Sequence, residues 1–176
     1  MKEKKGVSDM SRSKSKLSIV IALTALLTII LALVLPQISL RSQTHLGTDF
    51  TYIFGFTSTF GGKIVPIGSE LNAQLGFNVG AFLPLLFVLI AGVLLVVFDK
   101  QFSSYVFGAI LFTVSGILFI FSNRFVLETN GFITGFTNYV FTSFGTYVAL
   151  GLCCVGLIEC CIGAYLIKSD TSRRYR

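Results

Sequence analysis

The sequence of 176 residues contains no tryptophan, a single histidine and only three prolines. Charged side chains make up 12% of the chain, against roughly 25% in an average soluble domain. His45 and Asp49 are the nearest approach to a catalytic or metal-binding group, and two such residues form neither a triad nor a metal site. We therefore expect no enzymatic activity, no metal and no cofactor.

Cysteine is absent from every segment outside one apolar stretch near the C-terminus, which contains all four: Cys153, Cys154, Cys160 and Cys161. Structural disulfides belong in oxidising, solvent-facing loops, and those loops have no cysteine here. The Cys-x-x-Cys pair typical of thiol oxidoreductases is also missing. We interpret the cysteines as small packing residues, and acylation of Cys160 and Cys161 is the alternative.

Apolar residues are abundant, at 53% of the chain, and are gathered into four blocks of about 20 residues at 17–35, 80–98, 103–121 and 146–167. A helix of that length crosses a hydrocarbon core of about 30 Å. Backbone groups in lipid must bond one another, so each block should be helical. The sequence predicts an all-α membrane protein, a bundle of four transmembrane helices. The first block is too long for a typical signal peptide and has no cleavage site, so we expect it to remain.

Basic residues predict the orientation. Eleven of the fourteen Lys and Arg lie in three segments: the tail 1–16, the turn 99–102 and the tail 168–176. The remaining three lie in the loops 36–79 and 122–145. The positive-inside rule then places both termini in the cytoplasm of a multi-pass plasma-membrane protein. The net charge of +6 is interpreted as this topology signal and not as a nucleic-acid interface.

Each of the two outer loops contains a hairpin pattern. In the first, Phe56–Phe60 and Lys63–Ile67 flank Gly61 and Gly62. Two-residue links of this kind suit type I′ turns, and the flanks are rich in strand-forming residues. We expect the loops to form a small extracytoplasmic β-sheet, and flexible aromatic loops on the lipid headgroups are the alternative.

The second outer loop shows the same arrangement. Phe125–Thr129 and Phe132–Phe136 flank Asn130 and Gly131. Asn-Gly is a strong hairpin signal because both residues tolerate positive φ. This loop should therefore supply the second hairpin of the outer sheet.

One carboxylate interrupts the apolar blocks. Glu159 lies about 12 Å along the helix from the predicted cytoplasmic end, and no Lys or Arg occurs within any block. A charge at that depth costs several kcal/mol, so we expect a neutral acid or one that faces water or another protein. Gly156 and Gly163, with Leu152 and Cys160 beside them, form a strip of mostly small residues that allows close helix approach.

Three interpretations of Glu159 remain open. It is a hydrogen-bonded packing residue, with Ser115, Thr24 or Thr28 as partner; it lies at an interface with another subunit or membrane protein; or it couples transport to protons or cations. Transport normally needs several polar groups along a path, and the second and third blocks offer few.

Two resemblances follow from this organisation. Four helices capped by an outer sheet resemble the claudin-like architecture in topology, but without that family's Trp-containing motif or outer cysteine pair. Three short motifs are similar to uncharacterised four-helix membrane proteins of Gram-positive bacteria: Phe77-Asn78, Leu83-Pro84-Leu85 and Phe144-Gly145-Thr146-Tyr147. Neither resemblance implies an activity.

The function expected from the sequence is a structural or accessory role. The protein would bind another protein or lipid through its outer face and helix surfaces. Its partners would be membrane lipids and another membrane protein or a second copy, and not nucleic acid. The alternative is a small oligomeric transporter or channel that uses Glu159.

Overall fold

The computed structural model of the chain describes residues 3–44, 47–64, 73–129 and 140–174. The described helices are α1 (Glu3–Val34), α2 (Gly55–Phe60), α3 (Val79–Val97), α4 (Phe102–Thr129) and α5 (Phe144–Arg174). The described strands are β1 (Pro36–Thr44), β2 (Gly47–Phe54), β3 (Gly62–Ile64), β4 (Ala73–Leu75) and β5 (Val140–Thr142).

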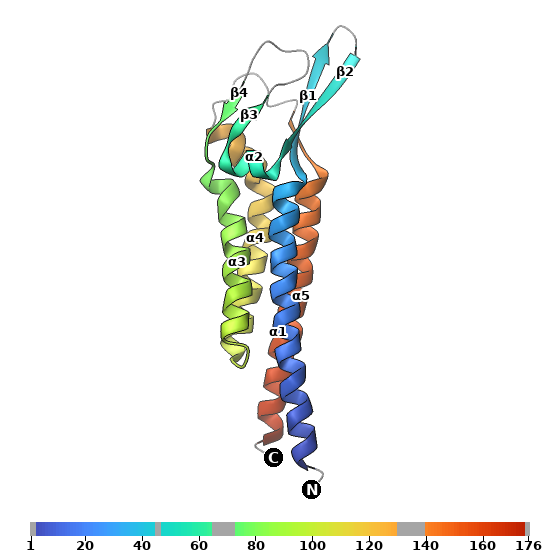
Figure 1. Cartoon of the computed structure of the whole chain (residues 1–176), viewed down its shortest axis with the longest axis vertical. Coiled ribbons are helices and arrows are strands. Elements are labelled where there is room, and N and C mark those ends of the chain that lie inside the picture. The colour runs from blue at the N-terminus through green and yellow to red at the C-terminus, as the bar shows by residue number, and fades with distance from the viewer. Residues whose placement is uncertain (1–2, 45–46, 65–72, 130–139, 175–176) are drawn as a thin grey trace.

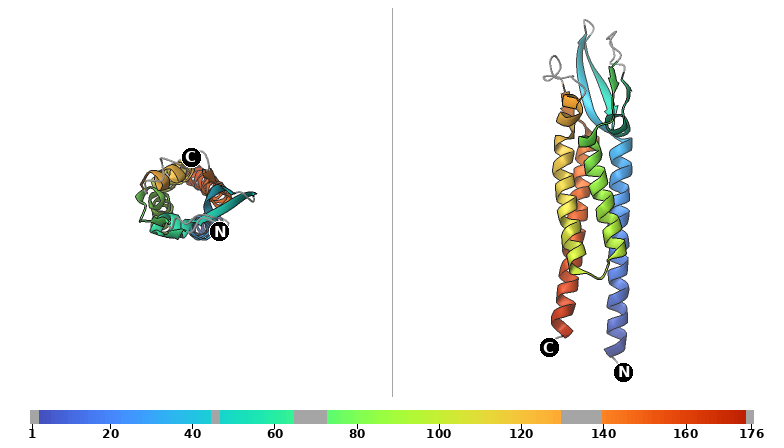
Figure 2. Two further views of the ribbon diagram at one scale, coloured as in Figure 1. Left: turned by 90° about the horizontal axis from the view of Figure 1, so that it is seen from above. Right: turned by 90° about the vertical axis from the view of Figure 1, so that its left-hand side faces the viewer.

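The four long helices form an up-down-up-down bundle. Going around it, α1 contacts α3 and α5, and α4 contacts the same two helices (Figure 2). The N- and C-termini lie at one end, and the strands and α2 lie at the other (Figure 1). The turn between α3 and α4 is tight, and helices joined in this way pack as antiparallel neighbours.

Within the described residues, four helical segments are long and apolar enough to cross a membrane: Lys16–Val34, Val79–Val97, Phe102–Ser122 and Phe144–Ser169. The prediction of four long apolar helices is confirmed. Three of the helices extend beyond their apolar segments, since α1 begins at Glu3, α4 ends at Thr129 and α5 ends at Arg174. The described parts of both basic tails are therefore helical.

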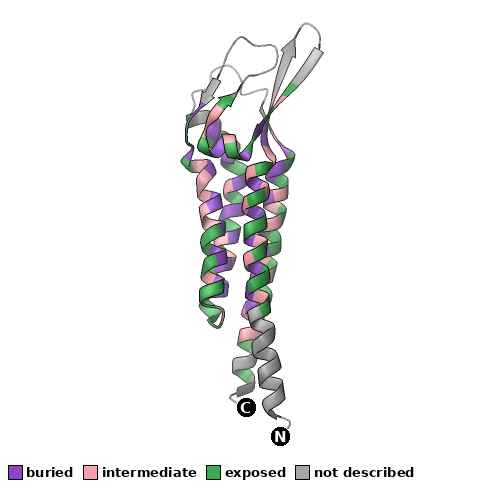
Figure 3. Cartoon of the chain, viewed as in Figure 1, coloured by how far each residue is buried: buried purple, intermediate pink, exposed green. Residues whose placement is uncertain are grey.

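The buried residues of the four long helices line the inside of the bundle, and many large apolar residues are exposed around its outside (Figure 3). On α1, for example, Ala25 and Thr28 are buried while Leu23 and Leu26 are more than half exposed. So large an apolar surface would be unstable in water. Its distribution around all four helices is what a hydrocarbon environment favours.

The strands form two antiparallel sheets at the end opposite the termini. The larger has the order β2-β1-β5, with Ile38 of β1 opposite both Ile53 of β2 and Thr142 of β5. The smaller pairs β3 with β4. We call this end, comprising α2 and the five strands, the cap. Its own apolar core joins Ile38 and Ile53 to side chains from the ends of α3 and α4.

The first predicted hairpin is wrong. Phe56–Phe60 is the helix α2, and Gly61 caps it with φ +90° and donates its N–H to the Thr57 oxygen. Strand β3 starts at Gly62 but pairs with β4, so Gly61 and Gly62 do not join two paired strands. Backbone hydrogen bonds from Gly55 to the Leu35 oxygen and from Asn78 to the Thr59 oxygen hold the two ends of α2, and the buried Ser58 hydroxyl is satisfied by the Gly55 oxygen.

The first strand of the second predicted hairpin is also wrong. Phe125–Thr129 forms the last turns of α4, and Asn130, Gly131 and 132–136 lie outside the described residues. Tertiary packing extends the helix past the apolar block, since Val126 is buried in the core of the cap and the Asn78 amide donates to the Phe125 oxygen at 2.9 Å. The longest hairpin pairs β1 with β2, in the part of the first outer loop that precedes the predicted hairpin.

Candidate functional site

Helix α5 buries one face against α4. Cys153, Gly156, Cys160 and Gly163 are buried on that face. The ring of Phe112 covers Gly156, and the ring of Tyr105 covers Gly163, so a β-carbon at either glycine would collide with the ring. The glycines therefore serve the packing of α4 on α5, with an aromatic ring in each gap.

Glu159 lies between these glycines in sequence but contacts α1. The Thr24 hydroxyl donates to Glu159 Oε1 at 3.2 Å. Of the other hydroxyls considered from the sequence, Thr28 donates to the Thr24 backbone oxygen and Ser115 donates to the Pro84 oxygen. Thr24 thus joins α1 to α5 at mid-bundle, while the strip of small residues faces α4.

The second carboxyl oxygen of Glu159 is less well satisfied. Among the residues that the structure describes, Oε2 is buried and has no hydrogen-bond partner. A buried carboxylate with one neutral hydrogen bond is poorly stabilised, so the geometry favours the uncharged acid. Groups of three or more metal-ligating side chains are not found in the described part of the chain.

The four cysteines are divided between the two sides of α5. Cys153 and Cys160 are buried, and Cys154 and Cys161 are exposed, all as free thiols. Cys153 and Cys160 lie in the bundle core with Ala149 and Phe112. The placement of Cys153 and Cys160 agrees with the interpretation of the cysteines as packing residues, whereas the exposed Cys154 and Cys161 do not pack in the bundle.

A buried polar cluster fixes the cap to the bundle. Gln37 is the extra residue of a β-bulge in β1, and its Nε2 donates to the Ala32 oxygen at 2.8 Å. The Thr146 hydroxyl lies 2.8 Å from Gln37 Oε1 and 3.1 Å from the Gln37 backbone oxygen, so its proton is shared between them. A β-carbon at Gly145 would lie 2.5 Å from the Pro36 backbone oxygen and 2.8 Å from Gln37 Nε2, so the cluster requires glycine at this position.

The large sheet has one buried and one exposed face. Ile38 and Ile53 point inward and are 1% and 3% exposed. On the opposite face, Tyr52 and Phe141 flank Ser39, which is paired with both. Phe50 and Phe54 lie two residues on either side of Tyr52 on the same face, and all four aromatic side chains are 46 to 54% exposed. We call these four residues the aromatic face.

A second group of aromatic rings lies where α2 and α3 meet. Phe60 contacts Phe56, Phe77 and Phe82, with ring centroids 5.0 to 6.3 Å apart. These rings stand at the start of the apolar segment of α3.

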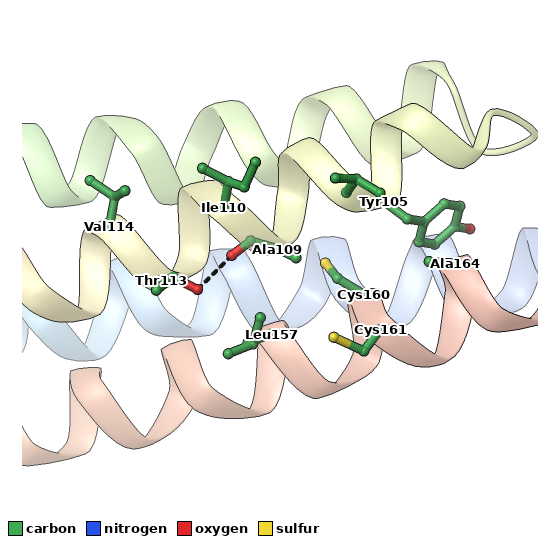
Figure 4. A pocket seen from close by; sticks show the side chains of 10 residues that line it. Tyr105, Ala109, Ile110, Thr113, Val114, Leu157, Cys160, Cys161 and Ala164 are labelled. Atoms are coloured by element: carbon green, nitrogen blue, oxygen red, sulfur yellow. Dashed lines mark hydrogen bonds between the residues drawn. The ribbon is translucent and has the colours of Figure 1, made fainter.

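A lateral groove of about 380 Å³ runs between α4 and α5 on the half of the bundle nearer the termini (Figure 4). Its walls are apolar, with Val106, Ile110 and Val114 from α4 facing Leu157, Cys161 and Ala164 from α5. The Thr113 hydroxyl in this groove is bonded to the Ala109 oxygen of its own helix at 2.8 Å. The groove therefore offers contact surface but few free polar groups.

Comparison with known proteins gives no matching family model, no matching curated protein and no matching solved structure. Function must therefore be argued from the residues themselves.

Sequence reasoning named Glu159, Gly156, Gly163 and Cys160 but missed the aromatic face and the Gln37 cluster. The aromatic face could have been predicted, because Phe50, Tyr52 and Phe54 occupy alternate positions, as side chains on one face of a strand do. Gln37 had no such signal, since its role depends on a bulge and on Thr146, 109 residues away.

Proposed function

We propose that this protein is a four-helix integral membrane protein with an accessory role, and that another protein binds its cap. The termini and the basic ends of α1 and α5 lie together at one end of the bundle, with the cap at the other (Figure 1). If the positive-inside rule holds, the termini are cytoplasmic and the cap lies outside the cell.

The aromatic face is the observation that carries this proposal. Exposed aromatic side chains clustered on one face of a folded sheet are typical of protein-binding surfaces, where they supply large contact area at low entropic cost. Phe54 lies at the base of the hairpin. Phe50 comes four residues before it in β2, about 13 Å away. The hairpin extends beyond the helices, so much of this face projects past the ends of the apolar segments (Figure 1).

The edge of the sheet supports the same function. In the described sheet β2 is an edge strand, because its neighbour is β1 and the order ends there. Exposed edge strands accept a further strand from a partner, with main-chain bonds for affinity and side-chain contacts for specificity. A partner strand beside β2 would also lie next to Phe50, Tyr52 and Phe54.

The interior of the bundle favours an accessory role over transport. Val88, Leu95 and Phe112 have no exposed surface, and Tyr105 is 1% exposed. These side chains come from α3 and α4 and fill the centre between the helices. A conducting path would need them to be replaced by water or polar groups.

Purification in mild detergent tests the proposal. An accessory protein should co-purify with one partner in fixed stoichiometry, and Phe50→Ser combined with Tyr52→Ser should release that partner. Phe56→Ser removes an equally exposed aromatic of the cap outside the sheet and should not. A homo-oligomer without a partner, unaffected by the double variant, would contradict the proposal.

The alternative is an oligomeric transporter that uses Glu159. The observation in its favour is the buried Oε2 without a partner, since a carboxyl group of that kind is typical of proton-coupling sites. Proton-driven flux in proteoliposomes, lost in Glu159→Gln while the fold is retained, would favour this alternative.

A further inference from the structure

We propose that the groove between α4 and α5 binds one acyl chain of an anionic phospholipid, whose headgroup lies against Lys100 and Lys168. The inference rests on the membrane insertion in the proposed function, but it concerns a different surface from the cap.

The chemistry of the groove selects a hydrocarbon. Apart from Tyr105 at one end and Thr113, whose hydroxyl is already bonded within α4, its walls are aliphatic or thiol side chains. A polar ligand would therefore lose its hydrogen bonds to water without gaining others. Ala109 and Ala164 supply the hollow, because each stands where a larger side chain would fill the space between the helices (Figure 4).

The shape of the groove suits an extended chain. The groove extends from Tyr105 to Val114 along α4, which is about 13 Å of helix. It is open along its side, so an acyl chain can enter it laterally and lie parallel to the two helices.

Charge at the open end selects the headgroup. Lys168 follows Cys161 and Ala164 by seven and four residues, so it continues the same face of α5 about 6 Å beyond the groove. Lys100 lies in the turn that precedes α4, and both lysines are exposed. Among the residues whose side chains the structure describes, Asp99 in that turn is the opposing charge, and Lys16 on α1 is a further cation at the same end of the bundle. A phosphate headgroup there would be held by long, flexible ammonium side chains.

Photocrosslinking tests this site in the full chain. The protein would be reconstituted in vesicles that contain phosphatidylglycerol with a photoreactive group on its acyl chain, or phosphatidylcholine with the same chain. After irradiation, mass spectrometry would locate the lipid adducts. We expect phosphatidylglycerol to label the groove more than the outward face of α3, where Leu89, Val93 and Val96 are similarly exposed.

Two variants separate the contributions of charge and shape. Lys168→Gln should lower phosphatidylglycerol labelling of the groove about fivefold, as expected for one cation near the surface, and Lys63→Gln in the cap should not. Ala109→Leu should lower labelling by both lipids, because it fills the groove.

The two proposals fail in different ways. A protein that alkaline carbonate extracts from membranes would not be inserted, and both proposals would be wrong. An inserted protein whose groove and α3 face are labelled alike, or whose groove is labelled equally by both lipids, would contradict the lipid site alone.

Discussion

The ring of Phe112 on α4 lies over Gly156 on α5, where an added β-carbon would come within 2.6 Å of the ring. Tyr105 covers Gly163 in the same way, seven residues away on each helix. A seven-residue spacing on both helices is the repeat expected for side chains that interlock along a helix pair. The contact between α4 and α5 is therefore built from aromatic rings set against glycines.

Replacement of Gly156 by alanine should destabilise the bundle. The new methyl group must displace the Phe112 ring, and overpacking of this kind costs about 1–3 kcal/mol. Gly151→Ala is the matched control on the same helix, because nothing lies within 4 Å of the added carbon. Thermal unfolding in detergent would compare the two variants, and equal stabilities would show that the ring does not depend on the glycine.

The contact between Thr24 and Glu159 should contribute little to stability. Hydrogen bonds between membrane helices average about 0.6 kcal/mol, so Thr24→Val and Glu159→Leu should each be mild and should be coupled by about that amount. Glu159→Gln should keep the fold, because glutamine is nearly isosteric. A double-mutant cycle in unfolding free energy measures the coupling, with Thr113→Val as a control that loses only a bond within its own helix.

The outcome of these variants also distinguishes the interpretations of Glu159. If it lies at an interface with a partner, glutamine should preserve the complex and leucine should weaken it. Large destabilisation by Glu159→Gln alone would contradict a neutral packing role, since it would mean that the charge is required.

Gln37 should be necessary for attachment of the cap. Gln37→Leu leaves the buried Ala32 oxygen without its side-chain donor, which costs about 1–3 kcal/mol, and removes the shorter of the two hydrogen bonds of the Thr146 hydroxyl. The cap should then become sensitive to protease while the helices stay folded. Gln101→Leu, at an exposed glutamine in the turn between α3 and α4, should have no effect on protease resistance. An equally resistant cap in both variants would contradict the role of Gln37.

The number and approximate position of the long helices could be predicted from the sequence, because the length of an apolar run determines them directly. Their ends could not. Helix α4 continues through Phe125–Thr129 because Val126 packs in the core of the cap and the Asn78 amide donates to the Phe125 oxygen. Both contacts involve residues distant in sequence. Phe56–Phe60 has the composition of a strand but forms α2, which is held at both ends by backbone hydrogen bonds to residues distant in sequence: Gly55 donates to the Leu35 oxygen, and Asn78 donates to the Thr59 oxygen.

Site prediction met the same limit. The sequence identified Glu159 as unusual, but it could not choose among three hydroxyls without the rotation of each helix about its axis. It also placed Gly156 and Gly163 beside Glu159, although the glycines face α4 and the carboxyl group faces α1. Successive residues of a helix are turned by about 100° about its axis, so the sequence alone could not say which neighbouring helix each side chain faces.

The orientation can be tested with single cysteines in a background without the native four. Lys63→Cys lies in the cap and Lys100→Cys in the turn at the opposite end, and both positions are exposed. An impermeant thiol reagent applied to intact cells should modify position 63 and not position 100. Modification of position 100 alone would reverse the orientation and place the cap in the cytoplasm.

Photocrosslinking in living cells tests whether the aromatic face binds another protein. A photoreactive amino acid would replace Tyr52 on the aromatic face or, as a control, Phe56 on α2, two positions that are 54% and 59% exposed. If the aromatic face binds a protein, we expect one discrete protein adduct from position 52 and none of that mass from position 56. Lipid adducts alone from position 52, or the same protein adduct from both positions, would contradict it.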